Sequence, residues 1–194
     1  MPCWAAAVFV LLSGGPALAH SAVPGVTGFS GGLLHPLLVS AHLLALAALG
    51  LLVGQQAPRQ RYSLIAIFAA SLLTGVAAIA SALAAENPDL IILAAAAILG
   101  LLVAVARPVP LIGAVPIVFM LGVALELDSV PQEISTRATL LTLAGTTITA
   151  LAIPALLAAL TSYLRRDWQG LGVRVVGSWI AASAILVLAL RLAK

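Results

Sequence analysis

Residues 90–106 read LIILAAAAILGLLVAVA, a run of apolar side chains that contains no charge. A helix needs about 20 residues to cross the roughly 30 Å hydrocarbon core of a bilayer, so this run is close to the shortest that can span it. Further apolar stretches lie at 36–54, 62–85, 109–125, 138–163 and 171–190. The sequence therefore predicts an all-α, polytopic bundle of about six transmembrane helices.

The composition of the whole chain supports the same fold class. Of its 194 residues, 63% are hydrophobic and 8% are charged, whereas a soluble domain carries roughly 25% charged residues. Transmembrane strands would alternate polar and apolar side chains in segments of about 10 residues, and no such alternation is present. The formal charge of +3 comes from nine Lys and Arg residues scattered between apolar runs, which indicates membrane topology rather than binding to nucleic acid.

The N-terminal segment is typical of a secretory signal peptide. Residues 4–12 form a short apolar core, a Ser-Gly-Gly-Pro breaker follows at 13–16, and residues 17–19 read Ala-Leu-Ala, which fits the small-x-small pattern of a signal peptidase site. Residues 1–3 contain no Lys or Arg, so only the terminal amine supplies a positive charge there. We expect residues 1–19 to be cleaved, leaving residues 20–194 as a single six-helix transmembrane domain.

The segments between the spans alternate in charge along the chain. In order, they carry Arg59 and Arg61; Glu86 and Asp89; Arg107; Glu126, Asp128, Glu133 and Arg137; then Arg165, Arg166, Asp167 and Arg174. Basic loops face the cytoplasm, and a cleaved signal peptide independently places the mature N-terminus outside. Both signals predict a multi-pass protein of the bacterial inner membrane with both mature ends in the periplasm.

Prolines and small residues indicate how the spans meet. Arg107-Pro108-Val109-Pro110 predicts a tight turn between two short spans, since each proline disfavours helix at the preceding residue. Gly50 and Gly54 have the GxxxG spacing of closely packed helices, although alanine-rich helices produce such spacings by chance. The fifth span carries Thr139, Thr142, Thr146, Thr147 and Thr149, which either line a polar pathway or bond to carbonyls during helix packing.

The most chemically suggestive stretch is His35–Leu46, which reads HPLLVSAHLLAL. Pro36 suits the first turn of a helix, where its missing N–H is not needed. His42 would lie on nearly the same face as His35 but about 10 Å deeper in a straight helix. Two ligands of one ion each lie about 2 Å from it, so other helices or His20 would have to contribute. The pair is a candidate metal site, and hydrogen bonding to a neighbouring helix is the alternative.

This stretch resembles the HupE/UreJ family, whose members resemble six-span permeases for nickel or cobalt. The pattern of the family at this point is close to HPxxGxDHxLAM, and His35, Pro36, His42, Leu44 and Ala45 match it. The resemblance extends over the mature chain, from a signal that ends Ala-x-Ala-His through a Gly-rich stretch into the first span. It implies binding of nickel or cobalt with His35 and His42 as ligands on the outer side. Imidazole with carboxylate suits any of the divalent transition metals nickel, cobalt, copper and zinc, and affinity order alone does not choose among them.

The sequence also departs from the family pattern. Val39, Ala41 and Leu46 stand where the family has Gly, Asp and Met. The fourth span of the family resembles FHGxAHGxE, whereas residues 119–128 read FMLGVALELD. When one inserted residue is allowed after Phe119, Gly122 and Ala124 keep their places and leucine stands at both histidine positions. His20, Glu126 and Asp128 are the remaining residues that the resemblance implies as candidate metal ligands.

Two functions from different classes follow. The first is transition-metal transport or binding at the periplasmic face. The alternative is a structural or accessory subunit that has lost transport and binds other membrane subunits, or copies of itself, through its alanine- and glycine-rich faces. An enzyme is not expected, because the sequence contains no HExxH motif and no GxSxG elbow that accompanies a partnered histidine.

Overall fold

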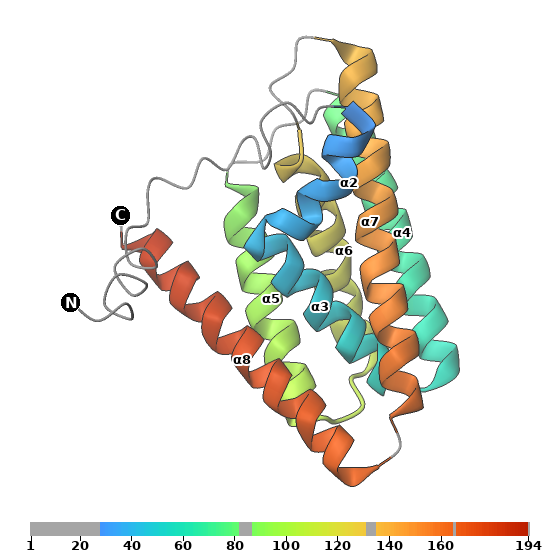
Figure 1. Cartoon of the computed structure of the whole chain (residues 1–194), viewed down its shortest axis with the longest axis vertical. Helices are drawn as coiled ribbons and strands as arrows, with labels where there is room; N and C mark the ends of the chain where they lie inside the picture. Colours follow the sequence, from blue (N-terminus) through green and yellow to red (C-terminus); the bar gives the residue numbers. More distant parts are fainter. Residues whose placement is uncertain (1–27, 82–86, 131–134, 165, 194) are drawn as a thin grey trace, which may run out of the picture.

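A computed structural model describes residues 28–81, 87–130, 135–164 and 166–193 (Figure 1). Within these ranges the fold is entirely helical, which confirms the predicted class. The helices are α2 (Gly28–Leu38), α3 (Ser40–Gln55), α4 (Pro58–Ala80), α5 (Pro88–Val105), α6 (Leu111–Asp128), α7 (Thr136–Tyr163) and α8 (Asp167–Leu192). The predicted signal peptide at 1–19 and His20 lie outside the described residues.

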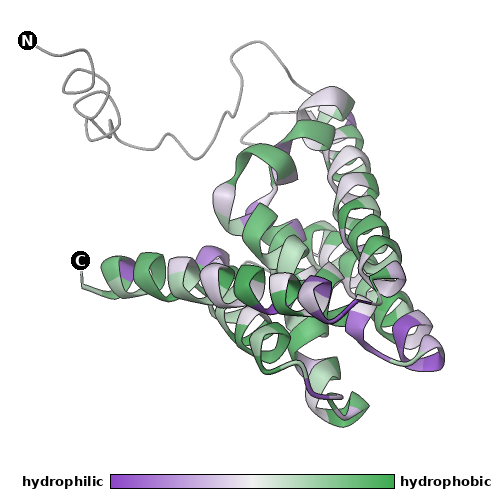
Figure 2. Cartoon of the chain, turned by 60° about the horizontal axis from the view of Figure 1, so that its bottom comes forward, coloured by the Kyte–Doolittle hydropathy of each residue, from purple (hydrophilic) through white to green (hydrophobic). Residues whose placement is uncertain are grey.

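The chain is a multi-pass membrane protein. Helices α4 to α8 are each long and apolar enough to cross a bilayer, and α2 and α3 together form a sixth candidate span that is bent by 72°. Figure 2 shows that hydrophobic residues dominate the helices, while hydrophilic residues gather mainly at their ends. The prediction of about six spans is confirmed, with the first span built from two helices instead of one.

The first span breaks at Val39, between α2 and α3. Val39 has φ −82° and ψ 109°, an extended conformation that suits a β-branched side chain. Helical hydrogen bonds continue on either side, from the Val39 amide to the His35 carbonyl and from the Leu43 amide to the Val39 carbonyl, each 3.0 Å long. The straight helix assumed for His35 and His42 is therefore wrong, and the two histidines lie on different helices.

Helix α2 docks against α7 through paired glycines. A Cβ atom added to Gly32 would lie 1.9 Å from the Thr142 carbonyl oxygen, and one added to Gly145 would lie 2.3 Å from the Phe29 carbonyl oxygen. Because these contacts are with backbone atoms, side chains at either position would force the helices apart. The glycines thus set the distance between α2 and α7 (Figure 1).

Threonines on α7 satisfy backbone carbonyls of α2. The hydroxyls of Thr142, Thr146 and Thr149 donate to carbonyl oxygens of α2 at 3.1, 3.3 and 2.9 Å, respectively. The acceptor of Thr146 is Gly32, whose carbonyl loses its normal i+4 partner because Pro36 has no N–H. These three threonines therefore serve helix packing.

We expect Thr146→Val to destabilise the docked position of α2 by about 1 kcal/mol. Valine keeps the shape of threonine but leaves the Gly32 carbonyl without its donor, and interhelical hydrogen bonds in membranes contribute about 0.6 to 1.7 kcal/mol. Thermal unfolding of the purified chain measures the loss. Thr139→Val is the matched control, because the hydrogen bond of the Thr139 hydroxyl among the described residues is to the Ser135 carbonyl at the start of its own helix. An equal loss in both variants would contradict this role.

The other helices also meet at small residues. Gly50 and Gly54 of α3 lie against Pro154 and Thr161 of α7, and Gly100 of α5 lies against Ala181 of α8. The GxxxG spacing on α3 is thus a real packing face. Helix α8 packs mainly on α5 and diverges from α7 after the short connection that joins them (Figure 1).

The end of the bundle that carries most of the basic residues is fixed by polar bonds to helix termini. The predicted turn at 107–110 is confirmed, since α5 ends at Val105 and α6 begins at Leu111. The Nη2 group of Arg61 donates to the carbonyls of Gly54 and Gln56 at the end of α3, at 3.2 and 3.0 Å. Gln56 in turn accepts from the Val109 amide at 3.2 Å, which ties the turn to the end of α3.

Candidate metal centre

The opposite end of the bundle brings three metal-binding side chains together. His35 lies in the last turn of α2, His42 in the first turn of α3, and Asp128 is the last residue of α6. Each offers one ligand atom, and these atoms all lie within 4.8 Å of one another. Among the described residues they form the one such group of His, Cys, Asp or Glu.

The break at Val39 creates this arrangement. In a straight helix the two histidines would be separated by about 10 Å along the axis. The 72° bend instead brings their rings together, with centroids 4.9 Å apart and planes inclined by 72°. No residue outside the pair is needed to bring the two imidazoles within reach of one ion.

Asp128 holds His42 in place. Its Oδ2 atom lies 2.9 Å from Nε2 of His42, whose side chain is 0% exposed, while the Asp128 side chain is 25% exposed. An ionised carboxylate only accepts hydrogen bonds, so Nε2 carries the proton while the two side chains are paired. An ion shared by His42 and Asp128 displaces that proton, because a metal ligand must be deprotonated. Within the described residues, Nδ1 is buried and has no hydrogen-bond partner.

Helix α6 runs to Asp128, three residues beyond the predicted end of the fourth span at 125. Glu126 and Asp128 therefore belong to the last turn of a helix instead of a loop, and they face different neighbours. Glu126 is 0% exposed, accepts a 2.7 Å hydrogen bond from the Thr147 hydroxyl, and packs against Gly75 of α4. Glu126 is not part of the cluster with His35, His42 and Asp128.

The donor set is suited to a divalent transition metal. Imidazole nitrogen with carboxylate oxygen is a common ligand combination for nickel, cobalt, copper and zinc. The ligand atoms of one ion, each about 2 Å from it, lie roughly 3 to 4 Å from one another, so the three side chains need only small movements to share an ion. Because the Asp128 side chain is partly exposed, an ion can reach the cluster from the surface of the protein.

The chain matches a known protein family over most of its length. The family model described as HupE / UreJ protein matches residues 8–187. The chain belongs to the HupE/UreJ family. In this HupE/UreJ chain the two leucines that replace the histidines of the fourth-span motif, Leu121 and Leu125, are both 0% exposed. None of the curated proteins and none of the solved structures shows a significant match.

Sequence reasoning had named all three cluster residues but not their contact. His42 and Asp128 are 86 positions apart, so no local pattern relates them. The signal that could have revealed the break is the combination of Pro36 with the β-branched Val39 between the histidines. The spacing of residues along the sequence does not indicate that α6 packs beside the break at Val39.

Proposed function

We propose that this HupE/UreJ protein binds a divalent transition-metal ion, nickel or cobalt as the family suggests, at His35, His42 and Asp128 as the first step of its transport. The observation that supports this proposal best is the convergence of three ligand atoms within 4.8 Å at the junction of three helix ends. Two neutral imidazoles and one carboxylate supply a single negative charge, which favours a cation. The ion is cargo, and the role of the protein is binding and transfer instead of catalysis.

The charge distribution supports an outward-facing site. Arg59, Arg61, Arg107, Arg166 and Arg174 lie at the end of the bundle opposite the cluster. In an inner membrane that follows the positive-inside rule, this end faces the cytoplasm. The cluster of His35, His42 and Asp128 then faces the periplasm, where an incoming ion arrives.

The broken first span supports transfer beyond binding. Transporters commonly place ion sites where a membrane helix is interrupted, because the helix ends there can move relative to each other. Below the cluster, α3 presents Ala45, Leu46 and Leu49, which are all 0% exposed. In the part of the chain that the structure describes, these buried apolar side chains leave no polar route for an ion from the cluster along α3, so passage of an ion requires α3 to shift against its neighbours.

Asp128→Asn tests the assignment of the site. We expect this variant to weaken binding of Ni²⁺ or Co²⁺ by about 10- to 100-fold, whether the carboxylate coordinates the ion or orients His42. Calorimetric titration of the purified chain measures the dissociation constant. Glu126→Gln is the control, since Glu126 bonds to Thr147 and is not in the cluster; a larger loss in Glu126→Gln than in Asp128→Asn would refute the assignment.

A second candidate function is that of a non-transporting accessory subunit. It is favoured by Leu121 and Leu125, which fill with apolar, fully buried side chains the positions where the family motif has histidines. This function predicts metal binding without uptake into vesicles, together with copurification of other membrane subunits at fixed stoichiometry. Metal uptake by vesicles that contain the purified chain alone would exclude it.

A further inference from the structure

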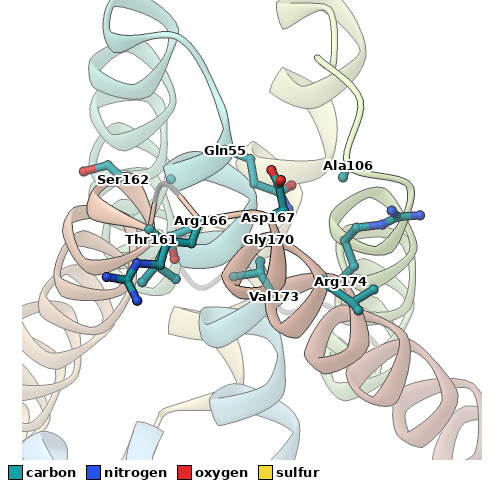
Figure 3. A pocket seen from close by; sticks show the side chains of 12 residues that line it. Gln55, Ala106, Thr161, Ser162, Arg166, Asp167, Gly170, Val173 and Arg174 are labelled. Carbon is teal, nitrogen blue, oxygen red and sulfur yellow. The ribbon is translucent and has the colours of Figure 1, made fainter.

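A second polar site lies at the end of the bundle opposite the histidines. There a cavity of about 510 Å³ opens beneath the connection between α7 and α8, a size typical of sites for small ligands. It is lined by the end of α3, the end of α7 and the first two turns of α8 (Figure 3). It shares no residue with the cluster of His35, His42 and Asp128.

Two arginines flank the cavity at the start of α8. Arg166 is the N-cap residue of the helix, Gly170 and Arg174 follow at intervals of four residues, and all three line the cavity. Figure 3 shows Arg166 and Arg174 on opposite sides of Gly170, with their guanidinium groups directed away from each other. A Cβ atom added to Gly170 would meet nothing within 4 Å, so the glycine leaves open space between the positions of the two arginines.

The arginines are placed to bind an anion. Arg174 donates from Nε to the Ala104 carbonyl at 3.0 Å, which fixes its stem and uses one of its five N–H donors. Both arginine side chains are exposed. Asp167 also lines the cavity, beside Gln55 (Figure 3), so the charged side chains described there sum to +1 from two arginines and one aspartate. Guanidinium groups bind phosphate oxygens in a bidentate manner.

The surroundings of the cavity indicate a lipid. Tyr163 and Trp168, at the end of α7 and the start of α8, are 78% and 66% exposed, and such aromatic residues mark the level of the headgroups. Exposed leucines continue from the cavity along both helices, with Leu160 on α7 and Leu171 on α8. Helices α7 and α8 diverge from this point (Figure 1), which leaves apolar surface for acyl chains.

We propose that this cavity binds the headgroup of an anionic phospholipid, with its phosphate over Gly170, where the exposed side chains of Arg166 and Arg174 turn toward it on binding. The Asp167 carboxylate accepts hydrogen bonds from headgroup hydroxyls, which suits the glycerol of phosphatidylglycerol. Basic pockets between membrane helices on the cytoplasmic side bind anionic headgroups in this manner. The bound lipid fills the space between α7 and α8 and holds α8 in its position. This site is independent of the proposed metal transport.

Native mass spectrometry of the delipidated full-length chain in neutral detergent tests the proposal. Phosphatidylglycerol is expected to bind at least about tenfold more tightly than phosphatidylcholine. The double variant Arg166→Gln with Arg174→Gln, and separately Gly170→Leu, are expected to weaken phosphatidylglycerol binding at least about tenfold. The double variant removes both positive charges, and Gly170→Leu fills the open space between the two arginine positions.

Two matched controls separate this site from general surface effects. Arg59→Gln removes one charge at the same end of the bundle, and Gly172→Leu adds the same side chain to α8 where a Cβ also meets nothing within 4 Å. Both are expected to bind phosphatidylglycerol as the parent chain does. The proposal is overturned if the controls lose binding equally, if phosphatidylcholine binds as tightly, or if inorganic phosphate displaces the lipid at equal concentration, which would indicate a site for free phosphate.

Discussion

Replacing His42 with alanine is expected to raise the dissociation constant for Ni²⁺ or Co²⁺ at least about 100-fold and to stop metal uptake into vesicles. His42 is the residue that links the other two members of the site, since its ring lies 4.9 Å from that of His35 and its Nε2 atom lies 2.9 Å from Asp128. Loss of an orienting partner alone weakens metal sites by 10- to 100-fold. Loss of the central ligand should exceed that range.

Leu43→Ala is the control for this experiment, because Leu43 follows His42 in the same helical turn and is 40% exposed. It shortens a side chain of α3 without touching a ligand. Uptake and affinity should remain those of the parent chain in Leu43→Ala. Unchanged uptake in His42→Ala would exclude the cluster as the transport site, while lost uptake with unchanged affinity would place the ion elsewhere.

The second large effect is expected from Gly32→Ala. The added Cβ would lie 1.9 Å from the carbonyl oxygen of Thr142, a backbone atom that cannot turn aside as a side chain can. Overpacking costs about 1 to 3 kcal/mol in well-packed cores, and here the whole of α2 must move away from α7. We expect a loss of about 3 kcal/mol in the stability of the docked arrangement and at least about tenfold weaker metal binding, because His35 moves with α2.

Thermal unfolding and metal titration of the same preparation measure both consequences. Gly113→Ala is the matched control, since a Cβ atom there has only the Pro110 ring in range, at 3.9 Å. It tests the effect of a glycine-to-alanine change in a membrane helix without a close approach. Wild-type metal affinity in Gly32→Ala would show that the position of α2 does not govern the site.

Much of the fold was predictable because it depends on local composition. The run at 90–106 became α5 (Pro88–Val105), and the two prolines at 108 and 110 ended one helix and began the next as expected. The family resemblance found in His35–Leu46 is confirmed by the match over residues 8–187. Hydropathy and proline act within a few residues of the chain, so these features were readable without knowledge of the partners in space.

The helix boundary at Asp128 was harder to predict for a physical reason. Glu126 and Asp128 are charged, which favours ending the span before them when hydropathy alone is considered. Thr147 and His42 supply hydrogen bonds from neighbouring helices, and these bonds allow α6 to continue through both carboxylates. The sequence of α6 alone does not show that other helices supply hydrogen bonds to its carboxylates.

The sequence by itself thus determined an all-helical membrane protein, the approximate positions of its spans and the identity of the residues able to bind a metal. The tertiary structure decided which of those residues meet. A single extended residue, Val39, turns the chain by 72° between His35 and His42, and the packing of α6 brings Asp128 to them from 86 positions away. Both features depend on contacts between helices. In lipid, every backbone N–H and C=O group must find a hydrogen-bond partner within the protein, and small residues allow particular helix pairs to approach closely. These two requirements select one arrangement of the helices among many that have the same hydropathy.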